Sequence, residues 1–274
     1  MISFPNAKIN LGLRILDRRE DGYHNLRSIF LPIHLHDILE ILPTKGNTIL
    51  VTSGLKIHGD ERDNLCLKAH QLLQKQYGIP NVRMYLHKQI PVGSGLGGGS
   101  SDAVACLVML NDMFRLKLLH DVLFSLAMEL GSDCGFFLYN QPALVEGRGE
   151  VIHPVNWPHP NLGVVILKPA TSISTAAAFK ACQPGEVAHE ALPEIQHWRT
   201  AILNDLEAYA FQVCPELQDF IQLLYQQGAV YAGMSGSGSA VFGLFEKEPG
   251  RLAVPDTVWQ YRTGVVSHQL TAIG

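Results

Sequence analysis

The stretch Pro91-Val-Gly-Ser-Gly-Leu-Gly-Gly-Gly-Ser-Ser-Asp102 carries five glycines within residues 93–99. It follows a strand-like run over residues 82–90 and leads into an apolar, helix-favouring run over residues 103–114. Glycine allows left-handed backbone dihedrals and a close approach to a ligand. The N–H groups of such a turn point toward an anion, and the dipole of the following helix adds partial positive charge. The stretch therefore predicts a phosphate-binding loop between a strand and a helix.

Other interpretations of this loop are weaker. It lacks the Gly-Lys-Ser/Thr ending of a Walker A loop, and nothing before it resembles the first strand of a dinucleotide-binding domain. A flexible linker would be polar and would not be framed by a strand and a helix. Ser100, Ser101 and Asp102 stand where we expect the N-cap of the helix, because their side chains can accept hydrogen bonds from its first N–H groups.

The composition bounds the class of protein. Hydrophobic residues make up 47% and charged residues 17% of the 274 residues, so a packed core is feasible. The net charge of −4 argues against binding to a nucleic-acid backbone. We see no signal peptide, and the strongest apolar run, residues 103–110, is too short to cross a membrane. We therefore expect a cytoplasmic protein with a small-molecule substrate and no nucleic-acid or membrane partner. The sequence does not fix the oligomeric state.

The cysteines predict no metal or redox site. The five of them are widely spaced and form no Cys-x-x-Cys pair, which argues against a zinc knuckle and a disulfide oxidoreductase motif. An odd, scattered number of cysteines suits free thiols in a reducing compartment.

Helical and strand patterns alternate along the chain, which predicts a mixed α/β (α+β) fold. Strands are expected, from alternating or continuous apolar runs, over residues 8–16, 28–42, 48–57, 82–90, 136–139, 162–168 and 240–245. Helices are expected, from their composition and apolar faces, over residues 64–77, 103–114, 118–130, 175–180, 194–209 and 216–227. Glycine and proline are concentrated over residues 142–160, so we expect two domains, residues 1–150 and 151–274.

Two charged residues suggest phosphoryl transfer. Lys8 lies in an otherwise apolar strand, and Asp133 lies in the glycine-bracketed turn 131–135. An aspartate can accept the proton of a substrate hydroxyl, and a neighbouring lysine can orient that carboxylate and stabilise the forming alkoxide. From the residues alone, a solvated strand lysine and a turn aspartate remain the simpler interpretations. A second glycine-rich loop, residues 233–239, precedes another strand-like run.

Four motifs together resemble the GHMP kinase superfamily, which includes galactose, homoserine, mevalonate and phosphomevalonate kinases. In chain order they are Pro5-Asn-Ala-Lys-Ile-Asn-Leu11, the glycine loop of residues 91–102, Gly131-Ser-Asp133 and Met234-Ser-Gly-Ser-Gly238. Asp21-Gly-Tyr-His24 and the triple-glycine form of the loop are similar to the branch that phosphorylates a cytidyl intermediate of the non-mevalonate isoprenoid pathway. The resemblance implies an N-terminal domain like ribosomal S5 domain 2 and a C-terminal ferredoxin-like domain around a central cleft.

The same resemblance implies the site residues. Asp133 would be the catalytic base and Lys8 its partner. The residues that would bind ATP are Pro91, Gly93, Ser94, Gly95, Leu96, Gly97, Gly98, Gly99, Ser100, Ser101, Asn64 and Lys88, the last two near the adenine end. The residues that would bind the cytidyl substrate are Asn10, Tyr23, His24, Phe30, Thr175 and Phe179. Ser101 is the implied protein ligand of Mg²⁺.

The implied reaction is ATP-dependent phosphorylation of the 2-hydroxyl in the methylerythritol part of the cytidyl substrate. Aromatic faces and hydrogen-bonding groups suit a cytosine base, and Tyr23, His24, Phe30 and Phe179 supply them. The alternatives are another small-molecule kinase of the superfamily, such as homoserine or mevalonate kinase, and a non-catalytic nucleotide-binding sensor. A sensor should have lost Lys8 or Asp133.

The chain departs from the superfamily at Cys134-Gly135, where an apolar residue and proline are usual. We expect this glycine to loosen the backbone just after the proposed base. A buried, inert thiol is the simpler interpretation of Cys134.

Overall fold

The computed structural model describes residues 1–183, 192–247 and 249–266. Two sheets build its first half. The strands β2 (Asn6–Arg18) and β3 (His24–His36) form an antiparallel hairpin, and β7 (Ala143–Gly147) and β8 (Val151–Pro154) extend it in the order β2-β3-β7-β8. The pairing of β8 with β7 carries this sheet past the expected boundary at residue 150 to Pro154.

The second sheet of this half has the order β1-β4-β6-β5. Its strands are β1 (Ile2–Ser3), β4 (Ile38–Pro43), β5 (Ile49–Gly54) and β6 (Val82–Lys88), and β5 runs parallel to β6. The helices of this half are η1 (Glu61–Asp63), α1 (Leu65–Tyr77), α2 (Gly98–Met113), α3 (His120–Leu130) and α4 (Cys134–Tyr139). Helix α2 contacts α1, α3 and α4 and is buried along most of its length, which fixes the glycine loop that precedes it.

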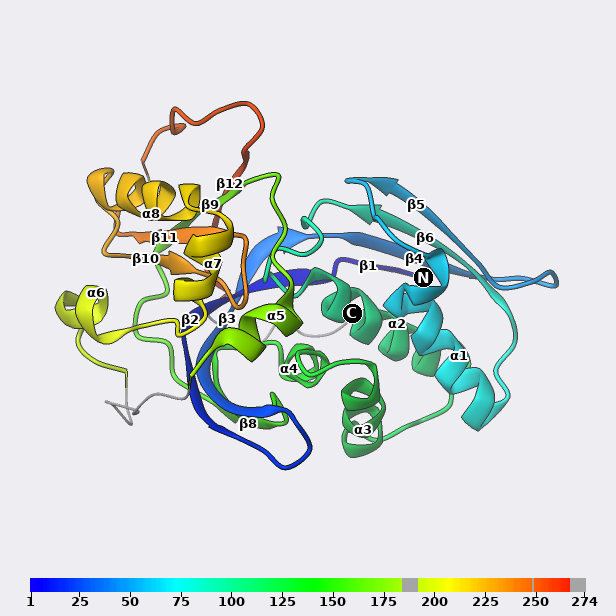
Figure 1. Ribbon diagram of the computed structural model, residues 1–274. Helices are drawn as coiled ribbons and strands as arrows, with labels where there is room; N and C mark the ends of the chain where they lie inside the picture. The colour runs from blue at the N-terminus through cyan, green and yellow to red at the C-terminus, as the bar shows by residue number, and fades with distance from the viewer. Residues whose placement is uncertain (184–191, 248, 267–274) are drawn as a thin grey trace.

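The second half is one antiparallel sheet covered by helices. The sheet has the order β10-β11-β9-β12, from strands β9 (Gly163–Lys168), β10 (Tyr231–Met234), β11 (Val241–Phe245) and β12 (Trp259–Gly264). The helices are α5 (Thr175–Ala181), η2 (Ile195–His197), α6 (Trp198–Ala201), α7 (Glu207–Val213) and α8 (Glu216–Gln226). Helix α8 packs on β10 and β11. In Figure 1 this sheet with α7 and α8 lies at one end, α1 to α4 lie toward the other, and α5 lies between them.

Strand β2 connects the two halves. The N–H of Leu13 donates to the carbonyl oxygen of Leu203 at 2.9 Å, and the N–H of Asp205 donates to that of Leu13 at 2.8 Å. Gly12 has a left-handed φ of +71°, and a Cβ at this position would lie 2.8 Å from Ile202 Cγ2. In the part of the chain that the structure describes, none of the helices has the length and apolar character that a bilayer-spanning helix needs.

Two expected elements differ from the structure. Residues 136–139 belong to helix α4 and not to a strand, because a short apolar run suits a buried helix as well as a buried strand. The expected helix over residues 194–209 is broken into η2, α6 and α7. The chain between α6 and α7 runs beside β2, where Asn204 forms a bridge to Leu13, so tertiary pairing overrides helical propensity there.

The start of α2 and five strands were also not predicted. Helix α2 begins at Gly98, with left-handed Gly97 as its N-cap, so Ser100, Ser101 and Asp102 lie inside the helix and do not cap it. Strands β7 and β8 occupy the glycine- and proline-rich stretch in which we expected the domain boundary, and β1, β10 and β12 had no expected counterpart.

Substitution of Gly12 tests how closely β2 approaches the chain at Leu203. Gly12→Ala should lower the free energy of unfolding by about 2–4 kcal/mol, because its methyl group meets Ile202 and a left-handed dihedral is costly for alanine. Gly78→Ala is the matched control, since Gly78 also has a left-handed φ of +65° but no atom lies within 4 Å of its added Cβ. Urea unfolding measures both variants, and equal losses would contradict the close approach.

Candidate active site

The side chains of Lys8 and Asp133 form an ion pair, with Nζ 3.2 Å from Oδ2. Lys8 lies in β2 and is 2% exposed, whereas Asp133 precedes α4 and is 36% exposed. The ammonium group also donates to Asn10 Oδ1 and, at 3.1 Å, to the carbonyl oxygen of Gly95. The buried ammonium group therefore has an acceptor for each of its three N–H donors, while the carboxylate of Asp133 remains accessible.

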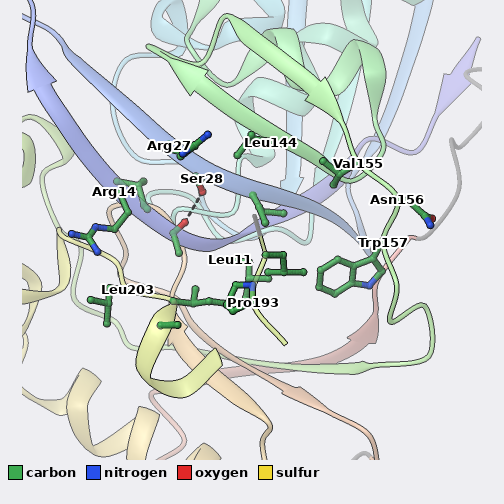
Figure 2. Close-up of a pocket in the computed structure, with 16 residues that line it drawn as sticks. Leu11, Arg14, Arg27, Ser28, Leu144, Val155, Asn156, Trp157, Pro193 and Leu203 are labelled. Atoms are coloured by element: carbon green, nitrogen blue, oxygen red, sulfur yellow. Dashed lines mark hydrogen bonds between the residues drawn. The ribbon is translucent and has the colours of Figure 1, made fainter. Parts of the chain in front are cut away.

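Asn10 is held in one orientation by its neighbours. Its Nδ2 donates to Ser28 Oγ at 3.1 Å, and Ser28 Oγ donates to the carbonyl oxygen of Gly12 at 2.5 Å, the dashed contact in Figure 2. Its Oδ1 is thereby turned toward the ammonium group. The backbone N–H of Asn10 donates to Ser235 Oγ at 3.2 Å, and that hydroxyl donates to the carbonyl oxygen of Gly95 at 2.9 Å. The sequence did not single out Ser28; Ser235 lay in the second glycine loop, which was the available signal.

A cavity of about 860 Å³, which we call the acceptor cavity, opens beside Asp133. Four of the predicted substrate residues line it, namely Tyr23, His24, Thr175 and Phe179. The lining also includes residues that were not predicted, among them Arg18, Ser132, Arg148 and Lys180. The structure thus brings the proposed base and most of the predicted substrate residues to one cavity.

Phe30 lies elsewhere. Its ring is 2% exposed, packs edge-on against Phe136 and lies 4.5 Å from Lys8 Nζ. A buried ring in these contacts offers no face to a base, so Phe30 supports the lysine instead of the substrate. The rings of His24 and Phe179 lie 5.8 Å apart at 31°. A base between two rings needs about 7 Å, so a base would stack on an outer face of this pair or require it to separate.

The glycine loop lines a second cavity of about 630 Å³, the phosphate cavity. The predicted ATP-binding residues that line it are Asn64, Lys88, Pro91, Gly93, Ser94, Gly95, Gly97, Gly98, Gly99 and Ser100. The N-cap of α2 makes no side-chain hydrogen bond, so the first N–H groups of this helix can serve an anion. Leu96 is fully buried and does not line the cavity; its carbonyl oxygen accepts the backbone N–H of Lys8 at 2.9 Å.

Lys88 lies beneath the glycine loop between two buried acids. Its Nζ donates to Asp37 Oδ2 and, at 2.7 Å, to Asp102 Oδ2. Burial alone would lower the pKa of Lys88, but the carboxylates of Asp102 and Asp37 raise it. Burial, together with the charge of Asp37, raises the pKa of Asp102 to about 7. Lys88 is 3% exposed, so it serves the packing of the loop and offers little to an adenine.

The second glycine loop crosses the first. A Cβ at Gly95 would lie 1.9 Å from the carbonyl oxygen of Ser235, so these loops can meet only at a glycine. Asn204 fixes the second loop, because its Nδ2 donates to the carbonyl oxygens of Met234 and Gly236 at 3.0 and 2.8 Å. Hydroxyl oxygens of Thr175 and Ser237 lie 2.8 Å apart, which ties α5 to the same loop.

The structure gives the Cys134-Gly135 pair a packing role that the sequence did not predict. Both residues are buried in α4, and a Cβ at Gly135 would lie 2.7 Å from the ring of Phe124 in α3. The glycine therefore permits close packing of α4 on α3. Burial raises the pKa of the Cys134 thiol to about 12, which keeps it protonated and inert near neutral pH.

A third cavity, of about 380 Å³, shares no lining residue with the other two. Figure 2 shows its mainly apolar lining, with Leu11 and Ser28 from β2 and β3 facing Trp157, Pro193 and Leu203. Ser28, whose hydroxyl orients Asn10, is one of its lining residues. Neither the proposed catalytic base Asp133 nor the glycine loop lines it, so we assign the proposed phosphoryl transfer to the acceptor and phosphate cavities.

The described residues contain no cluster of three metal-ligating His, Cys, Asp or Glu side chains. Mg²⁺ in kinases keeps several waters and takes one or two protein ligands beside phosphate oxygens. Ser100 lines the phosphate cavity, and a serine hydroxyl is a suitable ligand for such a site. The predicted ligand Ser101 is 3% exposed and does not line that cavity, so the structure favours Ser100 over Ser101.

Both halves of the chain match the GHMP kinases. The GHMP kinases N terminal domain matches residues 64–147, and the GHMP kinases C terminal domain matches residues 188–254. The 4-diphosphocytidyl-2-C-methyl-D-erythritol kinase of Bacteroides fragilis is 45% identical over 256 residues, which cover 90% of this chain and 93% of the relative. The kinase of the same name from Bacteroides thetaiotaomicron is 42% identical and covers 94% and 96%. The chain therefore belongs to the 4-diphosphocytidyl-2-C-methyl-D-erythritol kinase family of the GHMP kinases.

Solved structures of GHMP kinases resemble this chain in fold. A crystal structure of 4-(cytidine 5'-diphospho)-2C-methyl-D-erythritol kinase superposes with a TM-score of 0.76 at 33% identity, covering 96% of this chain and 99% of that one. Homoserine kinase from Cytophaga hutchinsonii superposes with a TM-score of 0.66 at 16% identity, covering 96% of each chain, and shares the fold. These likenesses confirm the two-domain GHMP kinase fold implied by the sequence motifs.

Lys88→Met tests the structural role of the lysine under the glycine loop. It should lower the free energy of unfolding by about 3–5 kcal/mol, because two buried carboxylates lose their shared cation. Adding Asp102→Asn should recover part of the loss. Lys68→Met, which removes the exposed ion pair with Asp63, should cost less than about 1 kcal/mol. A stable Lys88→Met variant with weakened ATP binding would show that the lysine serves the nucleotide instead.

Proposed function

We propose that this protein is a kinase that transfers the γ-phosphoryl group of ATP to the 2-hydroxyl of 4-diphosphocytidyl-2-C-methyl-D-erythritol, in the non-mevalonate isoprenoid pathway. The observation that carries the proposal is the ion pair of Lys8 and Asp133. Its ammonium group contacts Gly95 of the phosphate cavity, and its carboxylate lines the acceptor cavity. Relatives at 40–45% identity are 4-diphosphocytidyl-2-C-methyl-D-erythritol kinases by name, which supports the substrate.

In the proposed mechanism Asp133 accepts the proton of the acceptor hydroxyl as its oxygen attacks the γ-phosphorus, and the bond from that phosphorus to the ADP oxygen breaks. Lys8 holds the carboxylate and stabilises the negative charge on the attacking oxygen. Asn10 holds the ammonium group in place. The N–H groups at the start of α2 stabilise charge on the phosphates.

Mg²⁺ is the proposed metal, and Ser100 is the residue that would hold it. When bound, it would neutralise phosphate charge. The cytoplasmic location and the absence of nucleic-acid and membrane partners remain predictions from the sequence.

The acceptor cavity supports a base-containing acceptor over the alternatives. Tyr23, His24 and Phe179 are the aromatic side chains that line it, and aromatic faces bind bases. Homoserine and mevalonate carry no base and would leave these rings without a partner. A non-catalytic sensor is not favoured, because Lys8 and Asp133 are both present and paired.

ATP consumption with Mg²⁺ and different acceptors tests the substrate. We expect turnover with 4-diphosphocytidyl-2-C-methyl-D-erythritol and none with homoserine, mevalonate or galactose, because only the first supplies a base to the aromatic rings. Turnover with one of the other acceptors alone would keep the fold and overturn the substrate. Absence of turnover with all four acceptors would favour a non-catalytic sensor or a kinase that acts on a different acceptor.

Asp133→Asn tests the base. We expect a loss in kcat of about 10²–10⁴, because the amide keeps the shape of the carboxylate but cannot accept the proton. ATP affinity, measured by calorimetry, should stay within about twofold of wild type, since Asp133 does not line the phosphate cavity. Asp121→Asn, at a fully exposed acid of α3, is the control and should keep full activity. Retained turnover in Asp133→Asn would contradict the assignment of Asp133 as the catalytic base.

A further inference from the structure

Arg148 lies in the turn between β7 and β8 and lines the acceptor cavity. The centre of its guanidinium group, Cζ, is 3.8 Å from the centre of the Tyr23 ring. Its Nη1 lies 3.6 Å from Asp21 Oδ2, and Asp21 Oδ1 accepts the backbone N–H of Tyr23 at 3.1 Å. The guanidinium group and the ring are therefore fixed to each other both by stacking and through Asp21.

The turn that carries Arg148 packs closely against the turn that carries Asp133. Gly147 and Gly149, on either side of it, have left-handed φ values of +70° and +117°. A Cβ at Gly149 would lie 2.4 Å from the carbonyl oxygen of Ser132, the neighbour of the proposed base. The backbone N–H of Arg148 donates to the carboxylate of Glu150. The guanidinium group therefore reaches the cavity from a backbone with little freedom to move.

The charges that line the acceptor cavity are mainly positive. Among the described residues, the basic side chains of Arg18, Arg148 and Lys180 line it, and the one carboxylate is that of Asp133, which is already paired with Lys8. A cavity of this charge suits an anionic acceptor. A guanidinium group can stack its face on an aromatic ring while its edge N–H groups bind phosphate oxygens, which an ammonium group cannot do.

We propose that Arg148 is a specificity-determining residue for a nucleoside diphosphate acceptor, an inference that rests on the proposed function. Its guanidinium group covers one face of Tyr23 and so leaves the other face for the base. Its edge N–H groups bind the diphosphate that joins the nucleoside to the rest of the acceptor. One side chain thus sets both the orientation of the stacking ring and the preference for phosphate.

The chain offers a matched pair outside the site. Arg199 places its guanidinium group 4.3 Å from the centre of the Tyr225 ring, and neither residue lines the acceptor or the phosphate cavity. Arg199→Ala therefore removes the same kind of contact without touching the site.

Calorimetric binding of CDP and of cytidine tests the proposal in the full chain, with the phosphate cavity filled by a non-hydrolysable ATP analogue. The proteins compared are the wild type, Arg148→Ala, Arg148→Lys and Arg199→Ala. We expect Arg148→Ala to weaken CDP binding by about tenfold or more and cytidine binding by less, because it removes a charge-assisted contact that only CDP makes. Arg148→Lys should recover part of the CDP affinity and none of the cytidine affinity, since it restores charge without stacking. Arg199→Ala should bind both like the wild type.

Kinetics separate this role from a structural one. In Arg148→Ala the KM for the cytidyl acceptor should rise by about tenfold, with the KM for ATP and the midpoint of urea unfolding unchanged. Three results would each overturn the proposal. The first is unaltered CDP binding in Arg148→Ala, and the second is full recovery of both CDP and cytidine affinity in Arg148→Lys. The third is an equal rise in the KM for the cytidyl acceptor and the KM for ATP in Arg148→Ala. Wild-type protein that binds CDP but does not phosphorylate the acceptor would refute the proposed function and leave the Arg148 contact standing. Wild-type protein that binds no CDP would refute both.

Discussion

The buried ammonium group of Lys8 is the constraint on which the rest of the site depends. A charge that is 2% exposed is tolerated only when its donors are all satisfied. Its acceptors come from three separate parts of the chain: Asn10 on its own strand, Gly95 in the glycine loop and Asp133 at the start of α4. Satisfying the lysine therefore brings the phosphate-binding loop and the proposed base into contact with the same strand.

The glycines of the two loops are needed for close packing of the backbone as well as for the predicted phosphate binding. At Gly95 the backbone of the second loop comes so close that no side chain could fit, and at Gly97 an added Cβ would lie 2.9 Å from the ring of Phe137. Ser235 then reaches across from the second half of the molecule to the strand that carries Lys8. A glycine pattern in the sequence predicts phosphate binding, but the same glycines also allow the two halves to meet.

The sequence was most informative where a residue acts through its own local pattern. The glycine loop, Lys8, Asp133 and the Tyr23-His24 pair could be predicted because short motifs carry them. Arg148 and Ser28 could not be, since each matters through a partner far along the chain. The motif around Ser235 was visible, but its contact with Asn10 was not. The same holds for the expected helix over residues 194–209, which is broken where Asn204 is needed to hold the second glycine loop. Lys88 and Phe30 were assigned to ligands because burial cannot be read from a motif.

The two cavities bring charge to their ligands in different ways. The acceptor cavity is lined by Arg18, Arg148 and Lys180, whereas the phosphate cavity is lined by acids, namely Asp60, Glu61, Asp63 and Asp102. Lys88, the lysine that lines the phosphate cavity, is already held by Asp37 and Asp102. In the proposed function, backbone N–H groups and the dipole of α2 attract the nucleotide phosphates, and the proposed Mg²⁺ would neutralise them further. The proposed acceptor, by contrast, would find its countercharge in the side chains of the protein. A chain with a net charge of −4 can thus serve two anionic substrates, because its positive charge is concentrated where only one of them binds.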